Sequence, residues 1–407
     1  CFPQELHGAV DSTDRLFSFA RRAQPLEKSH IRAISDKVKA VDGINLGQGI
    51  CDLPTPEPIK ERTKAAVDAN KSIYSHHAGI EPLRAHILEK ARKTNDLPAR
   101  SIDEVVVGVG STGVFVTAAM ALLEAGDEAV LFEPFYGYHR NILELTGATV
   151  CTVPLGGPDD TFDPAVFEAA VTDRTKVVVV NTPANPSGKV WTRSELESLL
   201  NLLQRHDLIA LTDEIYEYML YDDAEHLSLG SLPEAYERTI TISGFSKAYN
   251  MTGWRLGYGV GPEPLIEQMG LVNDLLYICA PRPLQHGVLA VFEEMDKAYL
   301  DNLQRDYAER RRRMCETLEA EGFDVPWPKG AYYALADFSP LQDVRPGFDN
   351  DLEATETMIR EARVGCVTGR SFYDDPADGA TKLRFCFGKE MDDLKQACRQ
   401  IRNAFET

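Results

Sequence analysis

The sequence predicts an α/β protein in which a large domain, built on a mostly parallel sheet flanked by helices, is joined to a smaller α+β domain. Two observations predict this class. From residue 104 onward, short apolar runs alternate with helical stretches, the pattern of crossovers between parallel strands. From about residue 290 the chain becomes helical and charge-rich and then gives short strands. The expected domains are 1–57, an N-terminal arm with part of the small domain, 58–290, the large domain, and 291–407, the small C-terminal domain.

Composition narrows the class of protein. With 407 residues the chain can bury a sizeable core, and its net charge of −20 disfavours nucleic-acid backbones and anionic membranes as partners. The longest apolar runs are strand-sized, and no charged segment followed by an apolar core opens the chain. The eight cysteines form no C-x-x-C pair and no cluster with histidine at metal-binding spacing. We therefore expect a cytoplasmic protein with reduced thiols and no metal; a targeting segment removed ahead of Cys1 would not be visible.

The N-terminal quarter predicts an arm, an extended segment and helices. Residues 44–56 form the extended segment, in which Gly47 and Gly49 permit close backbone approach. Gly49 either offers its N–H to a ligand or simply makes a turn. A helix is expected over 58–70, and a second one places Leu83, Ile87 and Ala91 on one face.

The large domain is expected to follow a strand, loop, helix order. Runs of β-branched residues predict the strands, and periodic apolar positions predict the helices between them. Thr192 and Glu195 form a capping-box pair at the start of one helix. The expected strands are 105–107, 129–132, 176–180, 208–212 and 239–242, the helices are 114–124 and 192–206, and the small domain adds strands around 332–336 and 383–387 and a closing helix.

The first strand of this series leads into a glycine-rich turn, 108–113, with the spacing G-x-G-x-x-G. That spacing after a strand and before a helix is a formal dinucleotide fingerprint, and Glu133 ends the next strand, where a ribose-binding acid would stand. An NAD-linked dehydrogenase is therefore one alternative. Under either reading Ser111, Thr112 and Gly113 lie at a helix N-terminus, where free N–H groups and the helix dipole favour a phosphate.

The segment 240–261 holds two cations close to hydroxyl groups. It opens as a short strand and passes through Ser243 and Ser246 into Lys247, and Arg255 follows between two glycines. A lysine after a strand is usually a solvated loop residue. Two hydroxyls and two cations on one short segment nevertheless make a candidate anion site.

Three further loops follow strands, so we expect them at the same carboxyl edge of the sheet, where open α/β sheets bind ligands. Tyr136 follows one strand and can stack on a flat ring; Asn185 lies in a proline-rich loop; Asp213 ends a strand, with Tyr216 three residues on. Core aromatics, an Asx turn and a surface acid are the plain alternatives. Together with Lys247 the set fits pyridoxal phosphate, a flat phosphorylated aldehyde that forms a Schiff base with lysine and pairs its ring nitrogen with an acid.

The motifs also carry a family resemblance. Four segments resemble those of the class I/II, fold-type I aminotransferases, whose large domain has a mostly parallel seven-stranded sheet, and order and spacing are kept from about Asn45 to Arg384. The segments are S-G-F-S-K-A-Y-N-M-T-G-W-R-L-G-Y, N-T-P-A-N-P-S-G-K, T-D-E-I-Y and L-R-F-C-F-G. The resemblance implies a homodimeric transaminase that moves an amino group between an L-amino acid and a 2-oxo acid.

The same resemblance implies a role for each matching residue. Lys247 would form the internal aldimine, Asp213 would pair with the pyridine nitrogen, and Tyr136 would stack on the ring. Asn185 and Tyr216 would hydrogen-bond the phenolic oxygen, and Arg384 would bind the substrate α-carboxylate, helped by Asn185 and the backbone at Gly49. The phosphate would be held by Ser111, Thr112, Ser246 and Arg255, with Tyr74 reaching it from the neighbouring subunit.

Two positions depart from the family pattern. Gly244 stands where many relatives have serine three residues before the lysine, so Ser243 or Ser246 must supply that hydroxyl. Cys51 stands where a G-x-P-D motif would have proline, which predicts a looser loop over the substrate.

Besides the dehydrogenase, there are two alternatives to transamination: a lyase, which stays open, and a non-enzymatic regulator, which is disfavoured. A carbon-sulfur β-lyase on the same fold would keep every cofactor residue. A non-enzymatic regulator would need a DNA-binding module, for which the first 45 residues are too few. The substrate side chain is not predicted: Arg282 either contacts an acidic side chain from the facing subunit or is an interface arginine.

Overall fold

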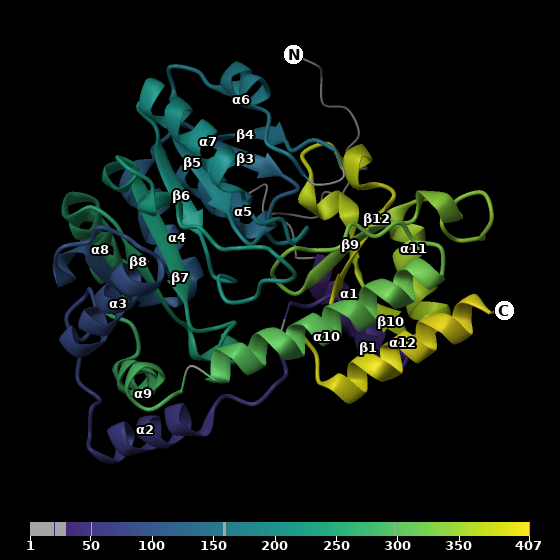
Figure 1. The fold of residues 1–407 in the computed structure, drawn as a ribbon, viewed down its shortest axis with the longest axis horizontal. Helices are drawn as coiled ribbons and strands as arrows, with labels where there is room; N and C mark the ends of the chain where they lie inside the picture. Colours follow the sequence, from purple (N-terminus) through teal and green to yellow (C-terminus); the bar gives the residue numbers. More distant parts are fainter. Residues whose placement is uncertain (1–19, 21–29, 50, 158–159, 297, 407) are drawn as a thin grey trace, which may run out of the picture.

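The computed structural model describes residues 20, 30–49, 51–157, 160–296 and 298–406. Its larger part is built on a sheet of seven strands in the order β2-β8-β7-β6-β5-β3-β4, with helices on both faces (Figure 1). Only β8 is antiparallel to its neighbours β2 and β7. The expected fold class is thereby confirmed. The strands are β2 (Val105–Val109), β3 (Glu128–Glu133), β4 (Thr149–Pro154), β5 (Thr175–Asn181), β6 (Ile209–Asp213), β7 (Thr239–Gly244) and β8 (Leu256–Val260).

The valine-rich strand β5 shows why the sheet needs helices on both sides. Its residues 177–180 are all valines and all at most 3% exposed, as expected for a strand with two covered faces. Val177 and Val179 pack in the core formed with α4, α5 and α8, while Val178 and Val180 pack in the core formed with α6 and α7. The helices are α4 (Gly110–Leu122), α5 (Gly137–Thr146), α6 (Pro164–Ala170), α7 (Arg193–Arg205) and α8 (Glu263–Tyr277).

Two local predictions can be compared with the helices. The capping box of α7 is confirmed, because the Thr192 hydroxyl accepts from the Glu195 N–H and the Glu195 carboxylate accepts from the Thr192 N–H. The start of α4 was predicted too late. Gly110 takes φ +72°, a left-handed value that glycine adopts without strain, so the chain turns within one residue and the helix begins there instead of at residue 114.

Strand β8 was not identified from the sequence, because its L-G-Y-G-V pattern places glycine in a strand interior. The structure gives the reason for one of these glycines. A Cβ at Gly257 would lie 2.3 Å from the backbone nitrogen of Ser111, so only glycine lets β8 approach the start of α4.

The smaller domain joins both ends of the described chain. β1, which follows α1, pairs in parallel with β10, and a three-stranded antiparallel sheet has the order β11-β12-β9. Figure 1 shows this domain on the opposite side from α3 and α8, with the long helix α10 beside α12. Its elements are α1 (His30–Ala40), β1 (Ile44–Asn45), α10 (Ala298–Ala320), β9 (Tyr333–Asp337), α11 (Asp351–Thr357), β10 (Val364–Gly365), β11 (Val367–Thr368), β12 (Lys382–Cys386) and α12 (Met391–Phe405).

Three helices lie between or beside these domains: α2 (Glu57–Asp68), α3 (Glu81–Thr94) and α9 (Arg282–Glu293). Leu83, Ile87 and Ala91 are buried on one face of α3, as their spacing predicted. The domain boundaries near residues 57 and 290 stay predictions. Within the described ranges, no helix has the length and apolar character needed to cross a membrane.

Candidate active site

A cavity of about 390 Å³ opens at the carboxyl edge of the large sheet, where β2, β3, β5, β6 and β7 end. Because β8 runs the opposite way, Arg255 just before its start reaches the same edge. Gly49 and Arg384 come from the smaller domain's side. The predicted site residues that line the cavity are Gly49, Ser111, Thr112, Tyr136, Asn185, Asp213, Tyr216, Ser246, Lys247, Arg255 and Arg384.

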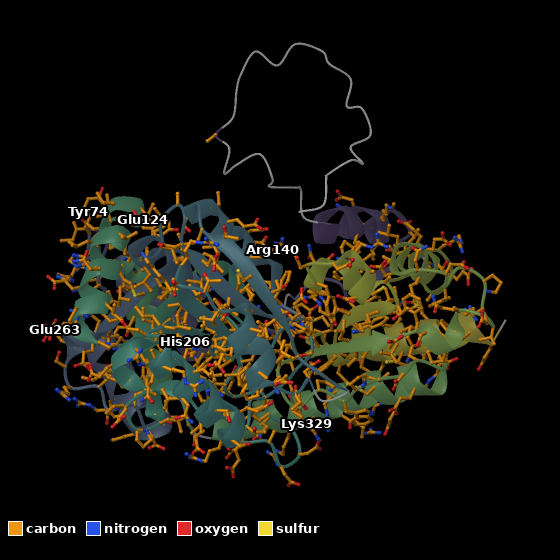
Figure 2. All side chains as sticks on the ribbon, turned by 90° about the horizontal axis from the view of Figure 1, so that it is seen from above. Tyr74, Glu124, Arg140, His206, Glu263 and Lys329 are labelled. Carbon is orange, nitrogen blue, oxygen red and sulfur yellow. The ribbon has the colours of Figure 1, made fainter. Side chains whose placement is uncertain are left out.

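Three predicted cofactor residues lie elsewhere. Gly113 is buried in the first turn of α4, behind Ser111 and Thr112. Ser243 does not reach the cavity, because its hydroxyl points into the protein and donates to Glu217 Oε1 at 2.7 Å; of the two serines named for the phosphate, only Ser246 lines it. Tyr74 is 74% exposed at the end of the large domain away from the smaller one (Figure 2), and its contact with a neighbouring subunit stays a prediction.

Lys247 follows β7 and extends its amine into the cavity. The Nζ atom donates to the carbonyl oxygen of Gly49 at 3.2 Å and lies over the rings of Tyr216 and Tyr332, 5.6 and 5.4 Å from their centroids. Burial lowers the pKa of Lys247 to about 8, because an apolar surrounding disfavours the charged amine. At pH 7 about a tenth of the Lys247 amine is therefore uncharged and able to act as a nucleophile.

The start of α4 and Arg255 form an anion cradle. Ser111 and Thr112 place hydroxyls beside the free N–H groups of this helix start, and Ser246 adds a third hydroxyl. Arg255 takes φ +55° and donates from Nη1 to the Thr252 carbonyl at 3.0 Å, which fixes its guanidinium. A Cβ at Gly110 would lie 2.4 Å from Arg255 Nη2, so glycine there is what lets the helix start meet the cation.

Asp213 has a buried partner that the sequence analysis missed. His139 on α5 is 3% exposed, and its Nε2 lies 2.9 Å from Asp213 Oδ2, while the Ile215 N–H donates to Asp213 Oδ1 at 3.2 Å. The His139 ring packs against Phe115 and Tyr136, with centroids 4.6 and 5.2 Å apart. The sequence could not predict the contact with Asp213, because it joins positions 74 residues apart. The one available signal was the place of His139 one helical turn after Tyr136.

Arg384 on β12 lies buried between the two domains. Its Nη1 donates to Asn185 Oδ1 at 2.8 Å and its Nη2 donates to the Gly47 carbonyl at 2.7 Å. Its Nε is buried without a partner, and its guanidinium lies 4.4 Å from the ring centroid of Tyr333. A fixed guanidinium that lines the cavity is suited to a carboxylate.

Tyr333 is a second cavity residue that the sequence analysis missed. Its hydroxyl lies 3.0 Å from that of Tyr216, and burial raises the pKa of Tyr333 to about 12. A Cβ at Gly49 would lie 1.9 Å from the Tyr333 hydroxyl, so this glycine is needed for the close approach of the loop after β1. The two tyrosines therefore stay protonated and share one hydrogen bond at the cavity wall.

Two other sequence features take a definite place. Cys51 is buried, with Sγ 2.9 Å from Asn250 Oδ1 and 3.2 Å from the Tyr307 hydroxyl; the looser loop predicted from this cysteine stays a prediction. Glu133, the candidate ribose-binding acid, is buried and accepts from the Asp374 N–H instead of facing the cavity.

The comparisons with known proteins agree with this geometry. A family model described as aminotransferase class I and II matches residues 41–401. An aspartate aminotransferase of Pyrococcus abyssi is 31% identical, over 93% of this chain and 98% of that protein. An aromatic-amino-acid aminotransferase 2 of Thermococcus litoralis is 33% identical, over 92% of this chain and 95% of that protein. Among solved structures, the N-succinyldiaminopimelate aminotransferase of Mycobacterium tuberculosis superimposes with a TM-score of 0.90 at 30% identity, covering 95% of this chain and 100% of that one.

Proposed function

We propose that this chain, a member of the class I and II aminotransferases, works with pyridoxal phosphate bound in the cavity at the edge of the large sheet. The chain transfers an amino group between an amino acid and a 2-oxo acid. The observation that carries the proposal is the place of Lys247. Its amine, with a pKa of about 8, opens into the same cavity as an anion cradle and the Asp213 carboxylate.

The residues present fit this cofactor. Ser111, Thr112, Ser246 and Arg255 would hold the phosphate, and Gly110 leaves room for the Arg255 guanidinium beside the helix start. Asp213 would hold the ring nitrogen, Tyr136 would stack on the ring, and Asn185 and Tyr216 would hydrogen-bond its phenolic oxygen. Lys247 would attach it through Nζ. When bound, pyridoxal phosphate supplies a ring that accepts the electron pair released at the substrate Cα.

The chain's own groups do the remaining work. Arg384, held by Asn185 and Gly47, lines the cavity and orients the substrate through its α-carboxylate. Lys247 Nζ, neutral in part near pH 7, takes the proton from the substrate Cα; such acid-base help is worth about 10²- to 10⁴-fold. His139 keeps the Asp213 carboxylate aimed into the cavity.

A homodimer is part of the proposal. Large apolar side chains are exposed on the loop after α2 and the end of α8, and a monomer rarely leaves such a patch open. Arg282 donates to the Ile73 carbonyl beside this patch at 3.3 Å, so we place it at the subunit interface. A second copy is the proposed occupant, with Tyr74 reaching its cofactor phosphate, and light scattering that gives the mass of one chain would contradict this. The exposed residues are Ile73, Tyr74, Leu275, Leu276 and Ile278.

A cytoplasmic location is also proposed. The seven cysteines in the described residues are all free thiols, which fits a reducing compartment. Separation of cell fractions followed by detection of the protein would test this, and recovery outside the cytoplasmic fraction would contradict it.

The visible absorption spectrum of the purified protein tests the function. A yellow band that bleaches when a particular amino acid is added, and returns with a 2-oxo acid, is the expected result. A band that persists while pyruvate and ammonia accumulate would indicate a β-lyase instead. No band after addition of pyridoxal phosphate would overturn the cofactor.

A further inference from the structure

Behind the cavity lies a group of buried polar side chains that the proposed function does not use. Glu217 has a side chain that is 3% exposed, and it forms an ion pair with Lys90 of α3, which is 11% exposed. Its Oε2 also accepts from Asn95 Nδ2 at 2.9 Å, and its Oε1 accepts from the Ser243 hydroxyl at 2.7 Å. None of these four side chains, which we call the Glu217 cluster, lines the cavity.

Both members of the ion pair stay charged. Burial has the largest single effect on Lys90 and opposes its charged form, but the attraction and hydrogen bond of Glu217, together with Tyr218 and Glu214, outweigh it and raise the pKa of the lysine. Burial is likewise the largest single effect on Glu217 and opposes its ionised form, but the attraction of Lys90 and His226 and the hydrogen bonds from Lys90 and Asn95 together outweigh it and lower the pKa of the carboxyl. Moving both charges out of water during folding costs about as much free energy as their attraction returns, so a buried ion pair of this kind contributes little to the stability of the fold. Stability alone is therefore a weak reason for its presence.

The cluster joins the two segments that carry the reactive groups. Glu217 directly follows Tyr216 and stands four residues after Asp213, while Ser243 stands four residues before Lys247. The backbone makes the same connection nearby, since the Glu214 N–H donates to the Ile242 carbonyl at 2.8 Å. Helix α3, which carries Lys90, packs against β2 and β8, so the lysine comes from an element outside both segments.

We propose that Lys90 is a positioning residue for transamination: through Glu217 and Ser243 it fixes the segments 213–217 and 243–247 relative to one another, and so sets Lys247 against Asp213 and Tyr216. The inference rests on the proposed function. Its physical basis is geometric, because a shift of about 1 Å between reacting groups can lower a rate on the order of 100-fold.

The test removes both charges together, since removing one would leave the other buried and unpaired. The double variant Lys90→Met with Glu217→Gln keeps the side-chain volumes close to the originals. Its matched control is Lys93→Met with Glu89→Gln, a lysine-glutamate pair on the same helix whose side chains are 73% and 55% exposed. We expect kcat of the buried double variant to fall at least about tenfold, with KM and thermal midpoint near those of the parent and the control unchanged.

A second readout separates positioning from general damage. The pH at which the visible cofactor band changes should shift in the buried double variant and not in the control, because that pH reports the surroundings of Lys247. If the double variant fails to fold, Ser243→Ala is measured in its place. This substitution removes the hydrogen bond from Ser243 to Glu217 and leaves the ion pair of Glu217 with Lys90, and a kcat severalfold below that of the parent supports the proposal.

Normal kcat and an unshifted band in the folded double variant, or in Ser243→Ala if that variant has to be used, would overturn this inference alone. A parent protein that shows no transamination would overturn the proposed function, and this inference with it.

Discussion

Replacing Arg384 with lysine keeps the positive charge between the domains and removes the planar fork. In the parent, Nη1 and Nη2 each use one N–H on Asn185 and on the Gly47 carbonyl, which aims the guanidinium and leaves the second N–H of each nitrogen for a ligand. A lysine amine is a single point of charge on a flexible stem, so it cannot bind a carboxylate with two parallel bonds.

The size of the effect follows from the bonds that are lost. A hydrogen bond to a charged group contributes about 1.5–3 kcal/mol, and the fork would supply one more such bond to the α-carboxylate than lysine can. At about 1.36 kcal/mol for each factor of ten, KM should rise about 10- to 150-fold. Because amino acid and 2-oxo acid both carry this carboxylate, KM should rise for both, while kcat changes much less.

Steady-state kinetics with an amino acid and with the amine that lacks its carboxylate measure the effect directly. The substitution should hardly change the slow reaction of the amine. Arg311→Lys is the matched control, because Arg311 is also buried and bonds both oxygens of Asp222 at 2.8 Å, but lies outside the cavity. An unchanged KM for amino acids, or an equal change for the amine, would refute the assignment of Arg384.

Three further predictions concern the cofactor end of the cavity. Lys247→Ala should bind pyridoxal phosphate weakly and without a covalent link, and single-turnover assays should show no product; normal turnover would contradict the role of this lysine. The rate at which the cofactor-free chain takes up pyridoxal phosphate, followed by stopped-flow absorbance, should rise with pH and level off above about 8, because the lowered pKa of Lys247 leaves about 300-fold more neutral amine at pH 7 than an ordinary lysine has. A rate that keeps rising to pH 10 would show that burial does not lower this pKa. His139→Leu should lower kcat about tenfold with little change in KM, since Asp213 loses a hydrogen bond, and His139→Gln should recover part of it; equal activity of His139→Leu and the parent would exclude a role for this contact.

Local patterns in the sequence were enough for most of the fold. The valine runs, the capping box of Thr192 and Glu195, and the apolar face of α3 each depend on residues a few positions apart, and the structure agrees with them. Glycine misled the reading in two places. Gly110 begins a helix and Gly257 lies inside a strand, because each one accommodates a close approach by a distant part of the chain that no local pattern reveals.

The site residues likewise fall into those that local sequence predicts and those that depend on contacts between distant parts of the chain. Residues at or just beyond the end of a strand, such as Asp213 and Lys247, could be placed from the sequence by itself, since the ends of parallel strands meet at one edge whatever the side-chain packing. The partners of those residues were decided only by tertiary structure. His139 beside Asp213, Tyr333 beside Tyr216, and Ser243 turned toward Glu217 all join positions 26 to 117 residues apart, and the direction of a side chain depends on packing against neighbours that are distant in the chain.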